Sequence, residues 1–166
     1  MPHIQGFSPI CSEHAHTLIL GSMPSRESLK QQRYYAHPRN GFWPIMSELF
    51  DMQDFNYAQR VAHLSGKGIS VWDVLKACFR SNSLDSNIDE RSIVTNDFAA
   101  FFQEHPGITR VFFNGAKAES IYRKHISPDL GNIQNRMSLQ RLPSTSPAYA
   151  ALPLADKLLA WKVITQ

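Results

Sequence analysis

The segment His16-Thr17-Leu18-Ile19-Leu20 leads directly into Gly21-Ser22-Met23-Pro24-Ser25. An apolar run without polar alternation is typical of a strand that is covered on both faces. Glycine and proline suit the turn that connects such a strand to a helix. The turn matches neither a Walker A loop nor a GxGxxG motif. Two roles are therefore open for the turn Gly21–Ser25. It is a simple connection between strand and helix, or it brings the backbone close to a ligand.

Three further apolar runs predict strands. The segments between the strands have apolar residues at helical spacing and predict helices. The strands are expected at 68–74, 109–114 and 137–142, the last a weaker candidate for a sheet edge. Helices are expected at 42–50, 96–105, 116–126 and 154–164, with Asn96 as an N-cap and Pro153 in a first turn. This alternation predicts an α/β fold, a three-layer α/β/α sandwich around a central, mostly parallel four-stranded sheet. The length of 166 residues favours a single domain over residues 1–166.

Composition narrows the class of protein. No apolar run approaches the roughly 20 residues that span a bilayer, and the N-terminus lacks the pattern of a signal peptide. Cys11 and Cys78 are far apart, and the histidines lack the spacing of metal ligands, so no metal, cofactor or disulfide is expected. We expect a cytoplasmic protein without membrane association. The net charge of +3 favours a polyanionic partner only weakly.

Each predicted strand ends in residues that are unusual for a simple connection. These ends are Gly21–Ser25, Trp72-Asp73, Asn114-Gly115 and the segment Pro143-Ser144-Thr145-Ser146-Pro147-Ala148. Parallel strands bring their carboxyl ends to one edge of a sheet, where ligands of open α/β folds bind. The sequence therefore predicts a site at this edge.

Alternatives stay open for these residues. Asp73 either caps a helix or accepts a hydrogen bond from the ring N–H of a ligand. Asn114 offers the same choice, and helix capping is the favoured role. The segment Pro143–Ala148 is either a plain surface loop or a set of hydroxyls that contact DNA phosphates.

A second motif, Tyr34-Tyr35-Ala36-His37-Pro38-Arg39-Asn40-Gly41-Phe42-Trp43, is rich in aromatic and polar side chains. Phe42 and Trp43 are expected to pack inside, and Asn40-Gly41 alone would indicate a turn. The composition also suits a pocket in which a tyrosine stacks on a base. In that case the Asn40 amide would position a water molecule, and His37 is the histidine best placed for chemistry.

These motifs, in this order, resemble the uracil-DNA glycosylase superfamily and most closely its hypoxanthine-DNA glycosylase branch. The similarity covers nearly the whole chain. It is carried by the Gly-x-x-Pro turn, Tyr34–Trp43, and the segments 68–75, 83–88, 113–115 and 142–148.

The resemblance implies a short parallel sheet between helices and assigns roles to individual residues. Related branches place Asn or Asp where this chain has Met23, so the water-positioning role passes to Asn40. Asp73 falls where other branches have an asparagine that binds the base. The loop Pro143–Pro147 matches the segment that presses into the DNA minor groove.

The resulting hypothesis is a monomeric, monofunctional glycosylase that flips out and excises a deaminated base, with hypoxanthine ahead of uracil or xanthine. No lysine lies in the two main motifs, so a Schiff-base step is not expected. Asn40 and His37 are the expected catalytic residues. The base pocket is expected to contain Gly21, Ser22, Met23, Tyr35, Phe42, Asp73 and Asn114, and the DNA contacts Pro24, Ser25, Arg39, Ser144, Thr145 and Ser146. Two other functions remain open, a non-catalytic binder of damaged DNA and a hydrolase of free nucleosides or nucleotides.

Overall fold

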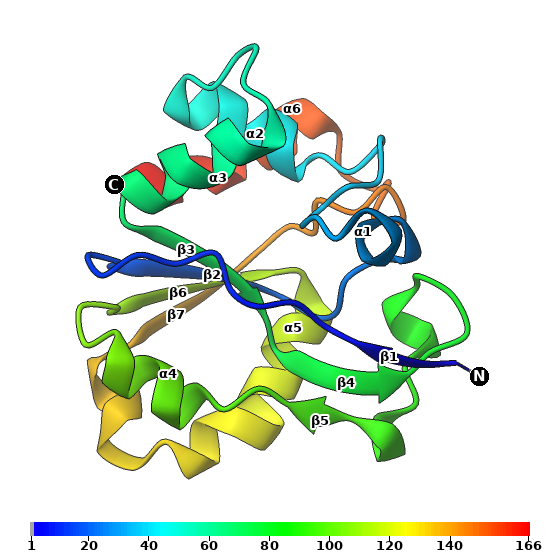
Figure 1. Ribbon diagram of the computed structural model, residues 1–166, viewed down its shortest axis with the longest axis vertical. Coiled ribbons are helices and arrows are strands. Elements are labelled where there is room, and N and C mark those ends of the chain that lie inside the picture. Colours follow the sequence, from blue (N-terminus) through cyan, green and yellow to red (C-terminus); the bar gives the residue numbers. More distant parts are fainter. Residues whose placement is uncertain (1) are drawn as a thin grey trace.

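The computed structural model describes residues 2–166 and has a four-stranded parallel sheet at its centre (Figure 1). Its strands follow the order β3 (Ile69–Asp73), β2 (Thr17–Gly21), β6 (Arg110–Asn114) and β7 (Ser138–Leu142). All three neighbouring pairs are parallel. The four predicted strands are confirmed, and β7 is the edge strand that its weaker apolar pattern indicated.

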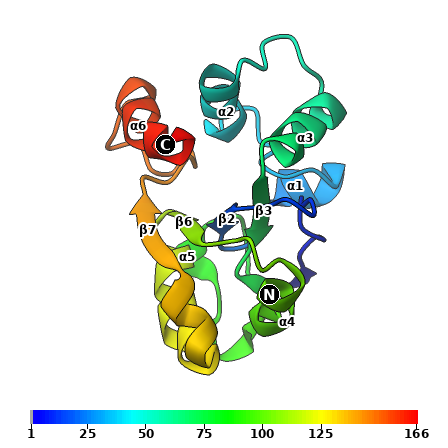
Figure 2. The same ribbon diagram turned by 90° about the vertical axis from the view of Figure 1, so that its left-hand side faces the viewer.

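Helices cover both faces of this sheet, which confirms the three-layer arrangement (Figures 1 and 2). On one side lie α2 (Phe42–Phe50), α3 (Tyr57–Gly66) and α6 (Leu154–Trp161). On the other side lie α4 (Phe98–Glu104) and α5 (Ala116–Ile121). The short helix α1 (Arg26–Gln31) follows the turn after β2. Within residues 2–166 no helix combines the length and apolarity needed to cross a membrane.

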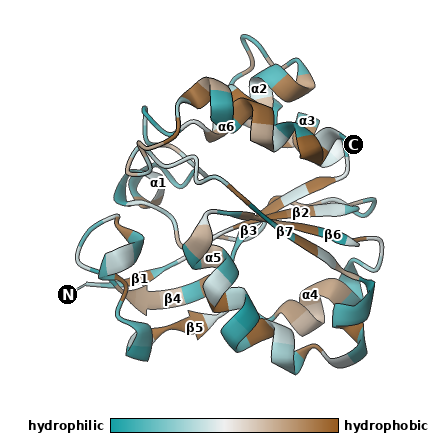
Figure 3. Ribbon diagram, turned by 180° about the vertical axis from the view of Figure 1, so that it is seen from behind, coloured by the Kyte–Doolittle hydropathy of each residue, from teal (hydrophilic) through white to brown (hydrophobic). Residues whose placement is uncertain are grey.

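Two apolar cores form because successive strand residues point to opposite faces of the sheet. Leu18 and Leu20 belong to the core under α4 and α5, whereas Ile19 belongs to the core under α2, α3 and α6. Phe42 and Trp43 are buried in the second core, as predicted. In Figure 3 apolar colour marks stretches of the central strands and of the helices that cover them. The buried strands therefore fix the positions of the loops at their ends.

A second, antiparallel sheet was not predicted. It has the order β1-β4-β5, formed by His3–Gln5, Leu75–Phe79 and Val94–Thr95. Two of these strands have only two or three residues, too few to show a pattern. The chain passes from Asp73 through Val74 into β4, so no helix begins there and a capping role for Asp73 is excluded.

Helix ends differ from the predictions in detail. Asp97, not Asn96, caps α4, because its side chain accepts a hydrogen bond from the Ala100 amide at 3.1 Å. Asn96 instead donates to the Asp73 carbonyl oxygen at 2.8 Å. Pro153 is the N-cap residue of α6 rather than a residue of its first turn.

The predicted helix at 116–126 is α-helical only to Ile121. It continues as a π-helical turn over Tyr122–Ile126. The predicted helix at 154–164 likewise ends as an α-helix at Trp161, and a 3₁₀ turn over Lys162–Thr165 follows. Helices α1 and α3 were missed.

Candidate functional site

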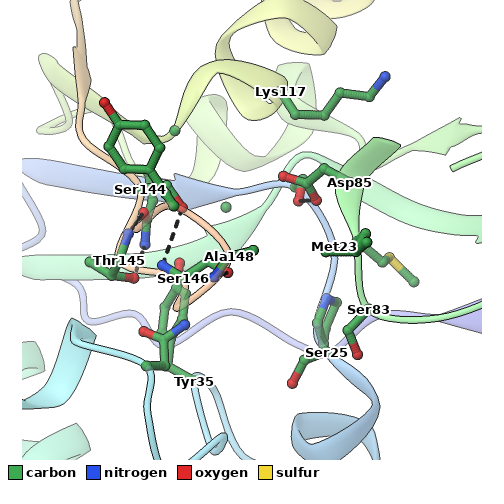
Figure 4. A pocket seen from close by; sticks show the side chains of 18 of the residues that line it. Met23, Ser25, Tyr35, Ser83, Asp85, Lys117, Ser144, Thr145, Ser146 and Ala148 are labelled. Atoms are coloured by element: carbon green, nitrogen blue, oxygen red, sulfur yellow. Dashed lines mark hydrogen bonds between the residues drawn. The ribbon is translucent and has the colours of Figure 1, made fainter. Parts of the chain in front are cut away.

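A cavity of about 490 Å³ lies at the carboxyl ends of the four parallel strands (Figure 4). This volume is within the range of about 300–1,000 Å³ that small-molecule sites occupy. We call it the strand-end cavity. Its walls come from the turn after β2, the ends of β3 and β6, the loop after β7, and the loop Ser83–Ser86. The structure thus brings together segments that are far apart in the sequence.

Most residues predicted for the site line this cavity. They are Gly21, Ser22, Met23, Pro24, Ser25, Tyr35, Asn40, Asp73, Asn114, Ser144, Thr145 and Ser146. Phe42, His37 and Arg39 are not among its lining residues. Residues without a predicted role also contribute, including Asp85, Lys117 and Tyr149.

Gly21 forms the floor of the strand-end cavity. It pairs with Asp73 in the β2–β3 ladder, so the two residues lie side by side at the sheet edge. A Cβ atom at Gly21 would lie 2.5 Å from Asp73 Oδ1 and 2.9 Å from Tyr35 Oη. Contacts this short would displace both side chains. Glycine is therefore required at position 21 because the Asp73 and Tyr35 side chains approach its backbone closely.

Tyr35 contributes an aromatic ring to the cavity from an unusual backbone conformation. Its φ of 54° lies in the left-handed region, which is uncommon for a residue with a side chain. The ring stacks on Phe42 with centroids 4.1 Å apart. Phe42 itself is fully buried, so its predicted contact with a base is wrong, and it supports Tyr35 from behind. The Tyr35 hydroxyl is buried without a hydrogen-bond partner in residues 2–166.

The Asp73 carboxyl group is buried at the end of β3, with 4% of the residue exposed. Its Oδ2 atom accepts no hydrogen bond within the described part of the chain. Burial, followed by repulsion from Asp85, raises the pKa of Asp73 from 3.8 to about 7. The positive charge of Arg80 opposes this shift. Burial disfavours the charged form of an acid, so Asp73 carries a proton more readily than a surface aspartate.

Asp85 adds a second carboxyl group to the same cavity. Its Oδ1 accepts a hydrogen bond from Ser22 Oγ at 2.5 Å. Partial desolvation of its carboxyl group raises the pKa of Asp85, while the Ser22 hydrogen bond and then the charges of Arg80 and Lys117 lower it. Asp85 lies in the motif segment 83–88, but no role was predicted for it. Its exposed, polar neighbourhood resembles an ordinary loop.

Asn40 lies at the cavity wall in a fixed orientation. Its side-chain Oδ1 accepts a hydrogen bond from the Phe42 backbone N–H at 2.9 Å, and the Asn40 backbone N–H donates to the His37 carbonyl oxygen at 2.9 Å. An amide carbonyl has two lone pairs, so Oδ1 keeps one for a further donor. His37 Nδ1 accepts from the Arg39 amide at 3.1 Å, and the ring does not line the cavity. The position of the His37 ring outside the cavity lining gives no support to its predicted catalytic role.

Asn114 and Thr145 join β6 to the loop after β7. Asn114 Nδ2 donates to Thr145 Oγ1, and the Thr145 amide donates to Asn114 Oδ1, both at 2.9 Å. The Thr145 carbonyl oxygen accepts from the Gly41 amide at 2.9 Å. The favoured capping role of Asn114 is therefore wrong, since Gly115 is the N-cap residue of α5. Thr145 is 1% exposed and holds the loop internally, which excludes the predicted contact of its hydroxyl with DNA.

Helix α6 holds the loop 143–149 through side-chain hydrogen bonds. The buried Lys157 ammonium donates to the carbonyl oxygens of Tyr149 at 2.8 Å and Ser146 at 3.3 Å. Trp161 Nε1 donates to the Pro143 carbonyl oxygen at 2.9 Å. Both roles were missed: Trp161 fitted an apolar helical pattern that indicated only packing, and no local signal marks Lys157. Within residues 2–166, no group of three or more His, Cys, Asp or Glu side chains is placed to hold a metal ion.

The fold and the strand-end cavity define an α/β protein of a known enzyme class. Residues 8–164 match the family described as the uracil DNA glycosylase superfamily, and the chain belongs to it. It is thus a DNA glycosylase, an enzyme that hydrolyses N-glycosidic bonds in DNA.

Named relatives are similar to the chain over most of its length. Hypoxanthine DNA glycosylases from Methanosarcina barkeri (strain Fusaro) and Methanosarcina acetivorans are 37% and 38% identical to it. Each alignment spans 116 residues, 69% of this chain and 72% of the relative.

A solved structure shares the fold. It is a solution NMR structure from Methanosarcina acetivorans that was assigned provisionally as a uracil DNA glycosylase. The two structures agree with a TM-score of 0.78 over 99% of this chain and all of the other, at 29% identity. This likeness confirms the α/β architecture.

Replacing Asp73 by Asn is expected to stabilise the protein more at pH 8 than at pH 5. The raised pKa means that the native state keeps a proton that the unfolded chain releases between about pH 4 and 7. Wild-type stability therefore falls across this range. One pKa unit corresponds to about 1.4 kcal/mol, so the loss is on the order of 3 kcal/mol. Thermal unfolding at both pH values measures it, with the exposed Asp129→Asn as control. Equal gains in Tm at pH 5 and pH 8 would contradict the assignment.

Replacing Lys157 by Met is expected to loosen the loop 143–149 without disturbing the central sheet. The substitution keeps the volume but removes two hydrogen bonds from a charged donor, each contributing about 1.5–3 kcal/mol. Amide hydrogen exchange at Ser146, Ala148 and Tyr149 should accelerate roughly tenfold or more. Lys162→Met, at an exposed position just after α6, is the control. Unchanged exchange in the loop would show that Lys157 does not hold it.

Proposed function

We propose that the chain is a monofunctional DNA glycosylase that removes hypoxanthine from DNA through attack of water at C1′. The observation that carries this proposal is the strand-end cavity, in which an oriented amide, Asn40, shares the wall with Gly21, Tyr35 and Asp73. The similarity to two hypoxanthine DNA glycosylases supports hypoxanthine as the base. A base inside a duplex is inaccessible, so it must be flipped out to enter such a cavity.

The flipped base would lie against Tyr35, which lines the cavity while Phe42 backs it. Stacking of a base on an aromatic ring contributes about 1–3 kcal/mol. Because Gly21 has no side chain, the edge of the base could approach the backbone of Ser22 and Met23. Amide donors at this point would stabilise negative charge that develops on the departing base.

Asn40 would position the attacking water. Its side chain cannot act as a strong base, but the Phe42 amide fixes its orientation. The second lone pair of Oδ1 would accept a hydrogen bond from water and hold it near C1′. Positioning of this kind is sufficient when bond breaking leads the reaction and leaves an electron-poor sugar.

Ser144 and Ser146 would contact the DNA backbone. Both are half-buried in the loop 143–149, and their Oγ atoms accept hydrogen bonds from the amides of Ser146 and Ala148. Each hydroxyl hydrogen is thus available for a phosphate oxygen. Ser25 is less suited, because it caps α1 through the Ser28 amide and donates its own hydroxyl hydrogen to Ser28 Oγ. Arg39 is exposed and remains a candidate phosphate contact outside the cavity.

Lys117 is the lysine in the cavity lining, and it bears on whether the enzyme forms a Schiff base. Its Nζ lies 2.6 Å from Glu90 Oε1 in an ion pair. A nucleophilic lysine has to lose its proton, and an ion pair with a carboxylate favours the protonated form. We therefore propose that the enzyme hydrolyses the glycosidic bond in a single step and does not cleave the DNA strand.

We also propose that the enzyme acts as a monomer.

Asn40→Ala is expected to lower the single-turnover release of hypoxanthine from a deoxyinosine oligonucleotide by about 100-fold, the loss typical of a misplaced nucleophile. Oligonucleotides with uracil or xanthine complete the substrate panel. Asn132→Ala, an exposed amide remote from the cavity, should keep the wild-type rate. Borohydride should trap no covalent complex.

Each result that differs from these expectations would contradict a different part of the proposed function. No base release from any oligonucleotide would remove the enzymatic proposal, and salt-dependent binding without release would indicate a non-catalytic binder. Turnover of free inosine in preference to DNA would indicate a nucleoside hydrolase. Wild-type rates for Asn40→Ala would remove the role of Asn40.

A further inference from the structure

Starting from the proposed function, we propose that Asp73 is a neutral carboxylic acid in the resting enzyme and protonates hypoxanthine as it leaves. The group would bind the base edge and then act as the general acid of the reaction. This assigns Asp73 a step that an asparagine side chain could not perform, because a neutral amide is far too weak an acid to release a proton.

The position of Asp73 leaves its carboxyl group in need of a partner from the cavity. The residue is 4% exposed, and Oδ2 has no hydrogen-bond partner within residues 2–166. Oδ1 lies 2.5 Å from the point that a Cβ atom on Gly21 would occupy, and both residues line the strand-end cavity. A buried, unpaired carboxylate is unfavourable, so such a group either binds a ligand or keeps its proton.

The charged and titratable groups around Asp73 come from three elements. Asp85, in the 3₁₀ turn Asp85–Asn87, adds negative charge, and Tyr34 and Tyr35 face it from the turn after α1. Arg80, which follows β4, is the nearby cation, but it is not ion-paired with Asp73 in the part of the chain described. Its Nη2 donates to the Pro24 carbonyl oxygen. Burial and Asp85 outweigh Arg80, and the pKa of Asp73 rises to about 7.

A neutral carboxyl group matches the edge of hypoxanthine better than a carboxylate does. It offers one O–H donor and one carbonyl acceptor, whereas a carboxylate only accepts. The base presents a carbonyl oxygen next to a ring N–H, so both groups find partners. A carboxylate would in addition repel the anionic base that forms when the glycosidic bond breaks.

In the proposed step Asp73 gives one proton to the departing base and regains one from solvent. The bond between C1′ and N9 breaks, and its electron pair goes to the base. The Asp73 proton moves to the carbonyl oxygen of the base, which leaves as a neutral tautomer of hypoxanthine. Water adds through its oxygen to C1′ and releases a proton to solvent, and the Asp73 carboxylate takes up a proton from solvent. The products are free hypoxanthine and an abasic sugar.

The test is the pH dependence of single-turnover base release from a deoxyinosine oligonucleotide between pH 5.5 and 9. Wild-type release should fall about tenfold per pH unit above the pKa of Asp73, because the acid form is lost. Asp73→Asn should release base more slowly and without this falling limb. Asp85→Asn should move the midpoint to lower pH by removing the like charge. Asp129→Asn, remote from the cavity, should keep the wild-type profile.

A second measurement is independent of activity. Carbon-13 NMR of the side-chain carboxyl groups, assigned with the Asp73→Asn variant, should show the Asp73 signal titrating near neutral pH. A midpoint near 4 would overturn the inference.

The activity data separate the two proposals. Base release with a flat profile above neutral pH, or a falling limb retained in Asp73→Asn, overturns the role of Asp73 alone. Absence of release at every pH removes the proposed function, and this inference with it.

Discussion

The contact of the Gly21 backbone with two polar side chains is the constraint on which the site depends. The parallel register of β2 and β3 places Gly21 beside Asp73, and the left-handed backbone of Tyr35 brings its hydroxyl group to the same point. Because Gly21 has no side chain, the carboxyl group and the phenol both reach the floor of the strand-end cavity. A larger residue would displace both side chains from the place where we expect them to contact the base.

The remaining walls are held by contacts between distant parts of the chain. Asn114 and Gly41 bind Thr145 from two sides, and Lys157 and Trp161 hold the ends of the same loop. The buried strands fix where these residues meet, and the hydrogen bonds fix how they are oriented. In the proposed reaction this rigidity allows an amide to position water, since Asn40 is oriented before any substrate binds.

Sequence patterns predicted the central sheet and helix α2 well, because apolar runs and helical spacing report burial directly. They predicted most of the cavity lining for a related reason: the ends of parallel strands must meet at one edge. Sequence patterns failed for side chains whose hydrogen-bond partner lies far away in the sequence. Nothing near Asn114 indicates Thr145, so a local capping role was favoured. Within Tyr34–Trp43, spacing could not show that Tyr35 lines the cavity while Phe42 lies behind it. The short strands β1 and β5 carry too few residues for a pattern.

The most direct test of the account is base release by Gly21→Ala, measured together with duplex binding and Tm. Gly66→Ala in α3 is the matched control, because a Cβ atom there meets no other atom within 4 Å. If the base is bound above Gly21, the Gly21→Ala variant should lose about 100-fold or more in single-turnover release of hypoxanthine while it remains folded and binds DNA. Wild-type release by this variant would contradict the account, because the base would then lie elsewhere.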